Sequence, residues 1–269
     1  MTWTILPVFD IAPDGTAYEL TGPNDAPCVV LIHGLGLSMS LWDAHMPAFK
    51  DWRVLRYDLF GHGQTAPTTS VGSLTLYSDQ IAELMDHLGI KAAHIVGFSI
   101  GGMINRRFAL DHADKVLSLA ILNSPHDRGE NAQRQVEDRA RAARDQGAFA
   151  TFDAALERWF TPEYLRSGQG PKLVRDWRAL VDDESYAQTA WVLANGVREL
   201  IAPEPAVVAS TLVMTCEHDS GSTPKMSHDI GSEIDGAQVI IVPRLQHLGL
   251  MEDPDAFTDP VVKFLSRRD

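Results

Sequence analysis

The chain has 269 residues, of which 45% are hydrophobic and 22% are charged, so it can bury the core of one large domain. Its 36 Asp and Glu residues outnumber its 23 Lys and Arg residues, which gives a formal net charge of -13. This balance disfavours nucleic acid and anionic membrane surfaces as partners, because both require a basic face on the protein.

The amino terminus and the two cysteines predict a cytoplasmic protein. Residues 1–7 lack a basic region followed by an apolar core, and no apolar run approaches the roughly 20 residues of a membrane helix. Cys28 and Cys216 each fall at an expected strand and show no metal-ligand spacing. We therefore expect buried free thiols in a reducing compartment.

Strand-like runs alternate with helical patterns along most of the chain. Such alternation predicts an α/β fold with a largely parallel sheet. The helical pattern after the turn at Gly61 has a core-facing stripe that includes Tyr77, Ile81 and Met85, and Gly89 ends it. Strands are expected at 2–9, 17–21, 27–33, 53–57, 93–98, 116–122, 210–215 and 237–242.

Residues 124–205 depart from this alternation. They lack strand patterning and carry several aromatic residues among helix formers. We expect a helical cap here, inserted after the sixth strand into an α/β core formed by residues 1–123 and 206–269.

A loop with two glycines, His33-Gly34-Leu35-Gly36, follows the apolar run 28–32. A continuous apolar run is typical of a strand buried on both faces of a parallel sheet. The Leu35 N–H is a candidate donor to an oxygen that becomes negative during acyl transfer. An ordinary glycine turn is the alternative interpretation.

Ser99 lies in the sequence Gly97-Phe98-Ser99-Ile100-Gly101, between an apolar run and a stretch compatible with a helix. The spacing is typical of a nucleophile elbow, a sharp strand-to-helix turn that exposes the serine hydroxyl to a base. Little side-chain bulk fits where strand and helix approach each other, which explains the flanking glycines. The Ile100 N–H would be the second oxyanion donor.

A carboxylate is expected between this serine and a later histidine in the chain order. Asp219 is the best candidate, because it follows the strand-like run 211–215 and precedes a turn rich in Ser and Gly. Its carboxylate would accept the Nδ1–H of the base and fix the imidazole tautomer. Glu217 and Asp127 remain open as alternatives.

His247 is the best candidate for the base. It follows the strand-like run 237–242 and precedes the helical segment 253–265, which places it in a loop at a strand end. His228 falls within an expected helix over 224–234, and His218 is adjacent to the candidate acid, so both are weaker candidates.

Together these motifs resemble the α/β-hydrolase superfamily over nearly the whole chain. The resemblance implies a mostly parallel eight-stranded sheet flanked by helices, with a cap over the cleft at the carboxyl ends of the strands. Because the nucleophile is serine, the chain differs from the superfamily's haloalkane dehalogenases and epoxide hydrolases, which attack with aspartate. The motifs, in the order of that family, are 33–36, Asp58-Leu59-Phe60-Gly61-His62-Gly63, 97–101, Glu217-His218-Asp219 and Gln246-His247.

Within the superfamily, the segments 101–104 and 156–163 are similar to those of 3-oxoadipate enol-lactonases and close relatives. This resemblance implies that Trp159 contacts the substrate. The turn at 59–60 lacks the family's usual arginine, and Cys216 replaces a usual glycine. These departures concern the choice of substrate and leave the reaction class unchanged.

Five arginines in the expected cap stand out in an acidic chain. One interpretation is that such an arginine, with Arg128 as the candidate, binds a substrate carboxylate through its planar guanidinium. The other is a solvated helix face with intrahelical ion pairs. The arginines are at 128, 134, 139, 141 and 144, and the acids among them are at 130, 137, 138 and 145.

The sequence thus predicts a serine hydrolase that cleaves a small carboxylic ester or lactone, such as an enol-lactone of aromatic catabolism, through an acyl-enzyme. Neither a metal nor an organic cofactor is predicted, and the expected partner is a small-molecule substrate. Two alternatives stay open: hydrolysis of a carbon–carbon bond in a diketone, and a receptor-like binder that senses its ligand with slow turnover. The oligomeric state is left open.

Overall fold

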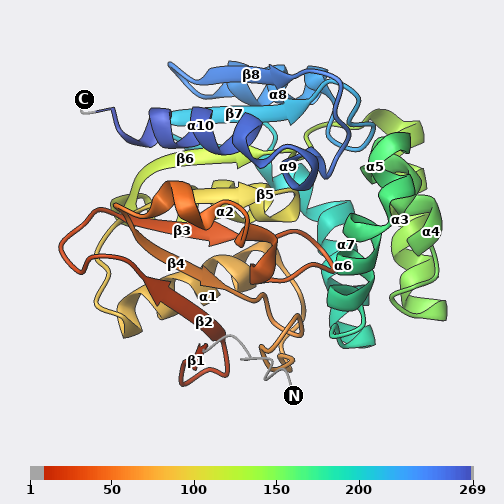
Figure 1. Ribbon diagram of the computed structural model, residues 1–269, viewed down its shortest axis with the longest axis horizontal. Coiled ribbons are helices and arrows are strands. Elements are labelled where there is room, and N and C mark those ends of the chain that lie inside the picture. The colour runs from red at the N-terminus through yellow and green to blue at the C-terminus, as the bar shows by residue number, and fades with distance from the viewer. Residues whose placement is uncertain (1–8, 268–269) are drawn as a thin grey trace.

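The computed structural model describes residues 9–267, which contain an eight-stranded sheet of order β1-β2-β4-β3-β5-β6-β7-β8 (Figure 1). β1 pairs antiparallel with β2 and β2 antiparallel with β4, whereas all other pairs are parallel. The predicted mostly parallel eight-stranded sheet is confirmed. The strands are β1 Asp10–Ile11, β2 Ala17–Thr21, β3 Cys28–Ile32, β4 Arg53–Tyr57, β5 Ala93–Phe98, β6 Val116–Leu122, β7 Thr211–Cys216 and β8 Gln238–Val242.

The strands from β2 onward each begin and end within one residue of the expected ranges. The strand expected over 2–9 lies outside the described residues except for residue 9, which is in no strand. The described edge strand is the two-residue β1, whose side chains are both exposed. It therefore has no buried face from which hydrophobic periodicity could predict it.

Helices cover both faces of the sheet, as the apolar run of β3 requires. Val30 and Ile32 pack in a core cluster with α1, α2 and α8, while Val29 and Leu31 pack in a second cluster with α10 and two short 3-10 helices. Successive strand residues point to opposite faces, so a strand buried on both sides is apolar throughout. These helices are α1 Leu74–His87, α2 Ile100–Asp111, α8 Pro224–Glu233, α10 Pro254–Leu265, η1 Met39–Trp42 and η2 Met46–Phe49.

The segment between β6 and β7 is helical and lies beyond the carboxyl ends of the parallel strands (Figure 1). Alanine-rich faces of α3 and α7 pack closely there in a third core cluster, which includes Ala140, Ala143, Ala190 and Ala194. Small side chains allow the two helices to approach closely. The helices of the segment are α3 Gly129–Gln146, α4 Phe152–Trp159, α5 Pro162–Ser167, α6 Gln169–Arg178, α7 Asp183–Asn195 and η4 Gly196–Leu200.

Cys28 and Cys216 are buried free thiols, as expected. Burial raises the pKa of Cys28 to about 11 and that of Cys216 to about 12, so both stay protonated at neutral pH. Within residues 9–267, the helices are too short or too polar to cross a membrane.

Candidate active site

Ser99 lies at the sharp turn from β5 into α2, with φ 58° and ψ -114°. This left-handed backbone is strained for a residue with a side chain, by about 1–3 kcal/mol. The turn is held because strand and helix meet closely: a Cβ on Gly97 would lie 2.1 Å from the Gly101 carbonyl oxygen, and one on Gly101 would lie 2.6 Å from that of Ile32. The glycines expected from the elbow spacing are therefore sterically required.

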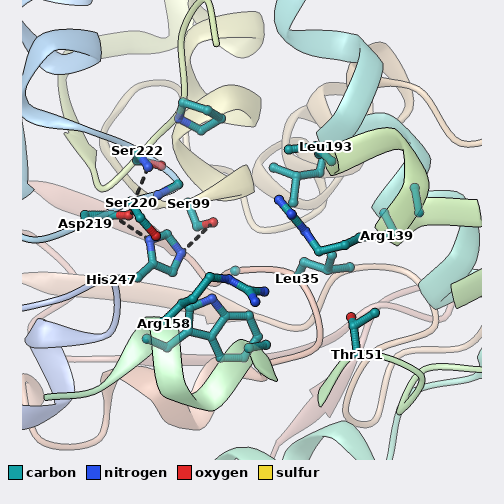
Figure 2. A pocket seen from close by; sticks show the side chains of 18 of the residues that line it. Leu35, Ser99, Arg139, Thr151, Arg158, Leu193, Asp219, Ser220, Ser222 and His247 are labelled. Carbon is teal, nitrogen blue, oxygen red and sulfur yellow. Dashed lines mark hydrogen bonds and ion pairs between the residues drawn. The ribbon is translucent and has the colours of Figure 1, made fainter. Parts of the chain in front are cut away.

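The structure brings Ser99, His247 and Asp219 together, although they come from three distant segments (Figure 2). His247 Nε2 lies 3.2 Å from Ser99 Oγ, and His247 Nδ1 lies 2.7 Å from Asp219 Oδ2. His247 lies in the loop between β8 and the short helix α9 (Gly249–Glu252), and Asp219 lies just after β7. These distances allow a proton to pass from the hydroxyl to the imidazole while the carboxylate orients the ring.

Asp219 is buried and accepts hydrogen bonds at both carboxylate oxygens. The Gly221 and Ser222 N–H groups donate to Oδ1 at 2.8 and 2.9 Å, and Asn123 Nδ2 donates to Oδ2 at 2.9 Å. Each of these donors helps to fix the position of the carboxylate. Sequence reasoning missed Asn123, although its place directly after β6 could have identified it as a neighbour of the residue that follows β7.

The competing acids and bases point elsewhere. The Glu217 carboxylate accepts the Arg244 N–H at 2.8 Å, and Asp127 accepts the Gly129 N–H at 2.9 Å. His228 is exposed on α8. His218 is also exposed, and its Nε2 lies 3.9 Å from a Glu217 oxygen. The geometry therefore leaves Asp219 and His247 as the candidate acid and base beside Ser99.

The two candidate oxyanion donors lie at the expected elements. Leu35 follows β3 in a turn, and Ile100 is the first residue of α2, whose N–H has no partner within the helix. Within the described part of the chain, neither backbone N–H donates a hydrogen bond. Both amides are thus available to a ligand, as an oxyanion hole requires.

His33 holds the Leu35 loop in place through two hydrogen bonds. Its Nε2 accepts the Leu59 N–H at 3.0 Å, so its Nδ1 carries the proton and donates to the Gly34 carbonyl at 2.8 Å. Burial lowers the pKa of His33 to about 4, which keeps the ring neutral and preserves this donor and acceptor pair. His33 therefore links the candidate oxyanion loop to the turn after β4.

A cavity of about 380 Å³ opens beside Ser99, between the sheet ends and the helical segment (Figure 2). Trp159 lines it, with its ring centroid 6.2 Å from that of His247. The Leu248 N–H donates to the Trp159 carbonyl at 2.8 Å, which ties α4 to the loop that carries His247. In residues 9–267, no group of three His, Cys, Asp or Glu side chains is placed to hold a metal ion.

The arginines of α3 and its N-cap residue Arg128 divide between two environments. Arg134, Arg141 and Arg144 pair with acids of the same helix, as the solvated-face interpretation predicts. Arg128 and Arg139 instead line the cavity. Sequence reasoning missed Arg139 as a lining residue, and it missed Arg158 of α4, because periodicity gives a helix face but not what lies opposite it.

Comparison with known proteins assigns the family. The model of the alpha/beta hydrolase family matches residues 29–259, so the chain belongs to the α/β-hydrolase family. The chain is 25% identical to 3-oxoadipate enol-lactonase 2 of Acinetobacter baylyi, over 97% of this chain and 99% of that protein.

Two further relatives agree. The (E)-2-((N-methylformamido)methylene)succinate hydrolase of the same organism is 26% identical over 84% of this chain and 86% of its own length. The crystal structure of the enol-lactonase from Burkholderia xenovorans LB400 superposes with a TM-score of 0.86 and is 30% identical, over 97% of this chain and 100% of that one. These relatives support a hydrolase and confirm the resemblance to enol-lactonases.

Proposed function

We propose that the protein is a serine hydrolase that cleaves a small carboxylic ester or lactone through an acyl-enzyme. The observation that carries the proposal is the hydrogen-bonded series from Ser99 Oγ through His247 to Asp219, at 3.2 and 2.7 Å. The elbow exposes the hydroxyl to the cavity and the base at the same time.

In the first half-reaction, Ser99 Oγ attacks the ester carbonyl carbon while its proton passes to His247 Nε2. The negative carbonyl oxygen accepts hydrogen bonds from the Leu35 and Ile100 amides, each worth about a hundredfold to a thousandfold in rate. When the carbon–oxygen bond to the leaving group breaks, His247 donates the proton to that oxygen. The alcohol leaves, or the lactone ring opens, and Ser99 carries the acyl group.

In the second half-reaction, a water molecule gives its proton to His247 Nε2 and attacks the acyl carbon. The bond to Ser99 Oγ then breaks, and the proton returns to the serine. Asp219 stays ionised throughout and stabilises the imidazolium that forms in each half-reaction.

The relatives guide the substrate class. One is named an enol-lactonase and another a hydrolase of a succinate derivative, which favours a small substrate bearing an acid group. Trp159 would form an apolar wall beside the reacting carbonyl. Arg128 would contribute positive charge for a carboxylate.

The test is turnover of p-nitrophenyl butyrate by the full chain. Replacement of Ser99 with Ala should abolish release of p-nitrophenol, with a loss on the order of a million-fold in kcat. A fluorophosphonate should add covalently to the unaltered protein at the peptide that contains Ser99. Replacement of Ser232 with Ala, on the exposed side of α8, is the matched control. Near-normal turnover by the Ser99 variant would refute the proposal.

A further inference from the structure

The cavity beside Ser99 carries more positive charge than acyl transfer requires. Arg128, Arg139 and Arg158 line it, and among the described lining residues the only carboxylate is that of Asp219, which is hydrogen-bonded to His247. Three guanidinium groups against one carboxylate leave an excess of two positive charges. The chain as a whole has a net charge of -13, so this local excess opposes the overall composition.

Among the cavity arginines, Arg139 differs from the outer arginines of its own helix, α3. Arg141 contacts Glu137 and Asp138 at 3.2 and 2.8 Å, and Arg144 contacts Asp145 at 2.8 Å. Over the part of the chain that the structure describes, the Arg139 side chain has neither a hydrogen bond nor an ion pair to another residue. The helix thus places paired cations toward solvent and an unpaired one toward the cavity.

Arg158 and Arg128 also lack carboxylate partners among residues 9–267. Arg158 donates to the Ala154 carbonyl at 2.7 Å and keeps its other N–H groups free of partners there. Arg128 donates to the Leu193 carbonyl at 2.9 Å and is held more firmly by the main chain. Figure 2 shows Arg139 and Arg158 reaching from two helices into the space beside Ser99.

The three groups also act on one another. Burial and, as a smaller effect, the charge of Arg139 together lower the pKa of Arg128 to about 10. Burial likewise lowers the pKa of Arg139, with Arg158 adding to the effect. Like charges held together in a partly desolvated cavity are unfavourable unless an anion joins them.

We propose that the substrate is a dianion, an ester or lactone that carries two carboxylates, and that Arg139 and Arg158 determine this specificity. One carboxylate lies against the free guanidinium of Arg139 and the other against that of Arg158, because planar guanidinium groups bind carboxylates through paired N–H donors. Leu35 and Trp159 form apolar walls that suit the carbon chain between the charges. This inference rests on the proposed hydrolase function and narrows its substrate class.

The first experiment compares three p-nitrophenyl esters: the neutral butyrate, the singly charged glutarate half-ester, and the doubly charged mono-ester of propane-1,2,3-tricarboxylic acid. For the unaltered protein we expect kcat/KM to be highest for the dianion. The ratio of kcat/KM for the dianion to that for the neutral ester should fall about 10- to 100-fold in Arg139→Gln and in Arg158→Gln. In Arg139→Lys the ratio should fall less than in Arg139→Gln, because lysine keeps the positive charge but lacks the paired N–H donors of a planar guanidinium.

Arg144→Gln is the matched control, because it removes an arginine of the same helix that is paired with Asp145. Its substrate ratio should stay within about twofold of the unaltered value. A second measurement, inhibition by free carboxylates, does not depend on which side of the ester carries the charges. The inhibition constant of glutarate against p-nitrophenyl butyrate turnover should be about tenfold or more below that of butyrate. Arg139→Gln should remove this difference.

The outcomes separate the two proposals. If no ester is turned over, the hydrolase proposal fails. If the neutral ester is turned over through Ser99 but the dianion is no better a substrate, or if Arg139→Gln and Arg144→Gln change the ratio equally, the hydrolase proposal stands and the dianion proposal is wrong.

Discussion

Arg178 is a fully buried guanidinium at the end of α6, only 1% exposed. Its Nη1 donates to the Ala148 carbonyl and to the Tyr186 hydroxyl, both at 2.8 Å, and its Nε donates to the Gly36 carbonyl at 3.4 Å. The Cζ atom of Arg178 lies 4.3 Å from the centroid of the Tyr186 ring. Because Gly36 belongs to the candidate oxyanion loop, Arg178 joins that loop to the helical segment. We predict that Arg178→Met lowers both stability and kcat.

The change in the free energy of unfolding caused by Arg178→Met is the balance of opposing contributions. Two close hydrogen bonds from a charged donor are worth about 1.5–3 kcal/mol each, and stacking on a buried aromatic ring adds about 1–2 kcal/mol. Removing a buried charge returns several kcal/mol of desolvation. The net loss for Arg178→Met should be about 1–3 kcal/mol, because the Ala148 and Gly36 carbonyls lose their donor. For a chain of this size, that corresponds to a decrease in Tm of roughly 2–10 °C.

Thermal unfolding followed by circular dichroism measures the first effect, and p-nitrophenyl butyrate turnover measures the second. Tyr186→Phe, which removes one acceptor and keeps the ring, should cost about 1 kcal/mol in the presence of Arg178 and less in the Met variant. This double-mutant cycle isolates the buried bond. If Arg178→Met melts at or above the temperature of the unaltered protein and keeps its kcat, the guanidinium does not support the loop and the reasoning is refuted.

Two other changes follow from the site and the core. Asn123→Ala removes a donor from Asp219 Oδ2, so kcat/KM for p-nitrophenyl butyrate should fall about tenfold or more, whereas unaltered kinetics would show that the backbone donors suffice. Burial lowers the pKa of His45 to about 4, so the native protein binds fewer protons than the unfolded chain between that value and about 6.5, and stability is lost as the pH falls through this window. Urea unfolding should show that the loss of stability between pH 7 and pH 5 is about 2 kcal/mol smaller in His45→Gln than in the unaltered protein, and equal losses in both proteins would contradict the assignment.

The sheet could be predicted because its signals are local. The run Cys28–Ile32 is apolar throughout, and the structure buries all five of its residues. The elbow at Ser99 was predictable for the same reason, since the close approach of strand and helix leaves room only for glycine at positions 97 and 101. A burial or steric requirement that involves only residues close together in the chain can therefore be recognised from the sequence.

The partners of Asp219 and Arg178 could not be predicted in this way. Asn123 and Asp219 are 96 residues apart, and only the pairing of β6 with β7 makes them neighbours. Arg178 reaches Gly36 across 142 positions of the chain. An isolated Asn after a strand or an Arg at a helix end has many common roles, so the sequence alone does not select among them.

The positive charge of the cavity could not be predicted from the net charge of the chain. A net charge of -13 correctly indicates an acidic chain, but it averages over surfaces that a ligand never meets. The acids of α3 compensate its outer arginines, so the helix is nearly balanced in sequence while its two faces differ: Glu137 and Asp138 pair with Arg141 toward solvent, and Arg139 faces the cavity without a partner among the described residues. What a small anion meets at Ser99 is set by this local separation of charge, because the field inside a partly desolvated cleft depends on the groups that line it. An acidic protein can therefore select an acidic substrate.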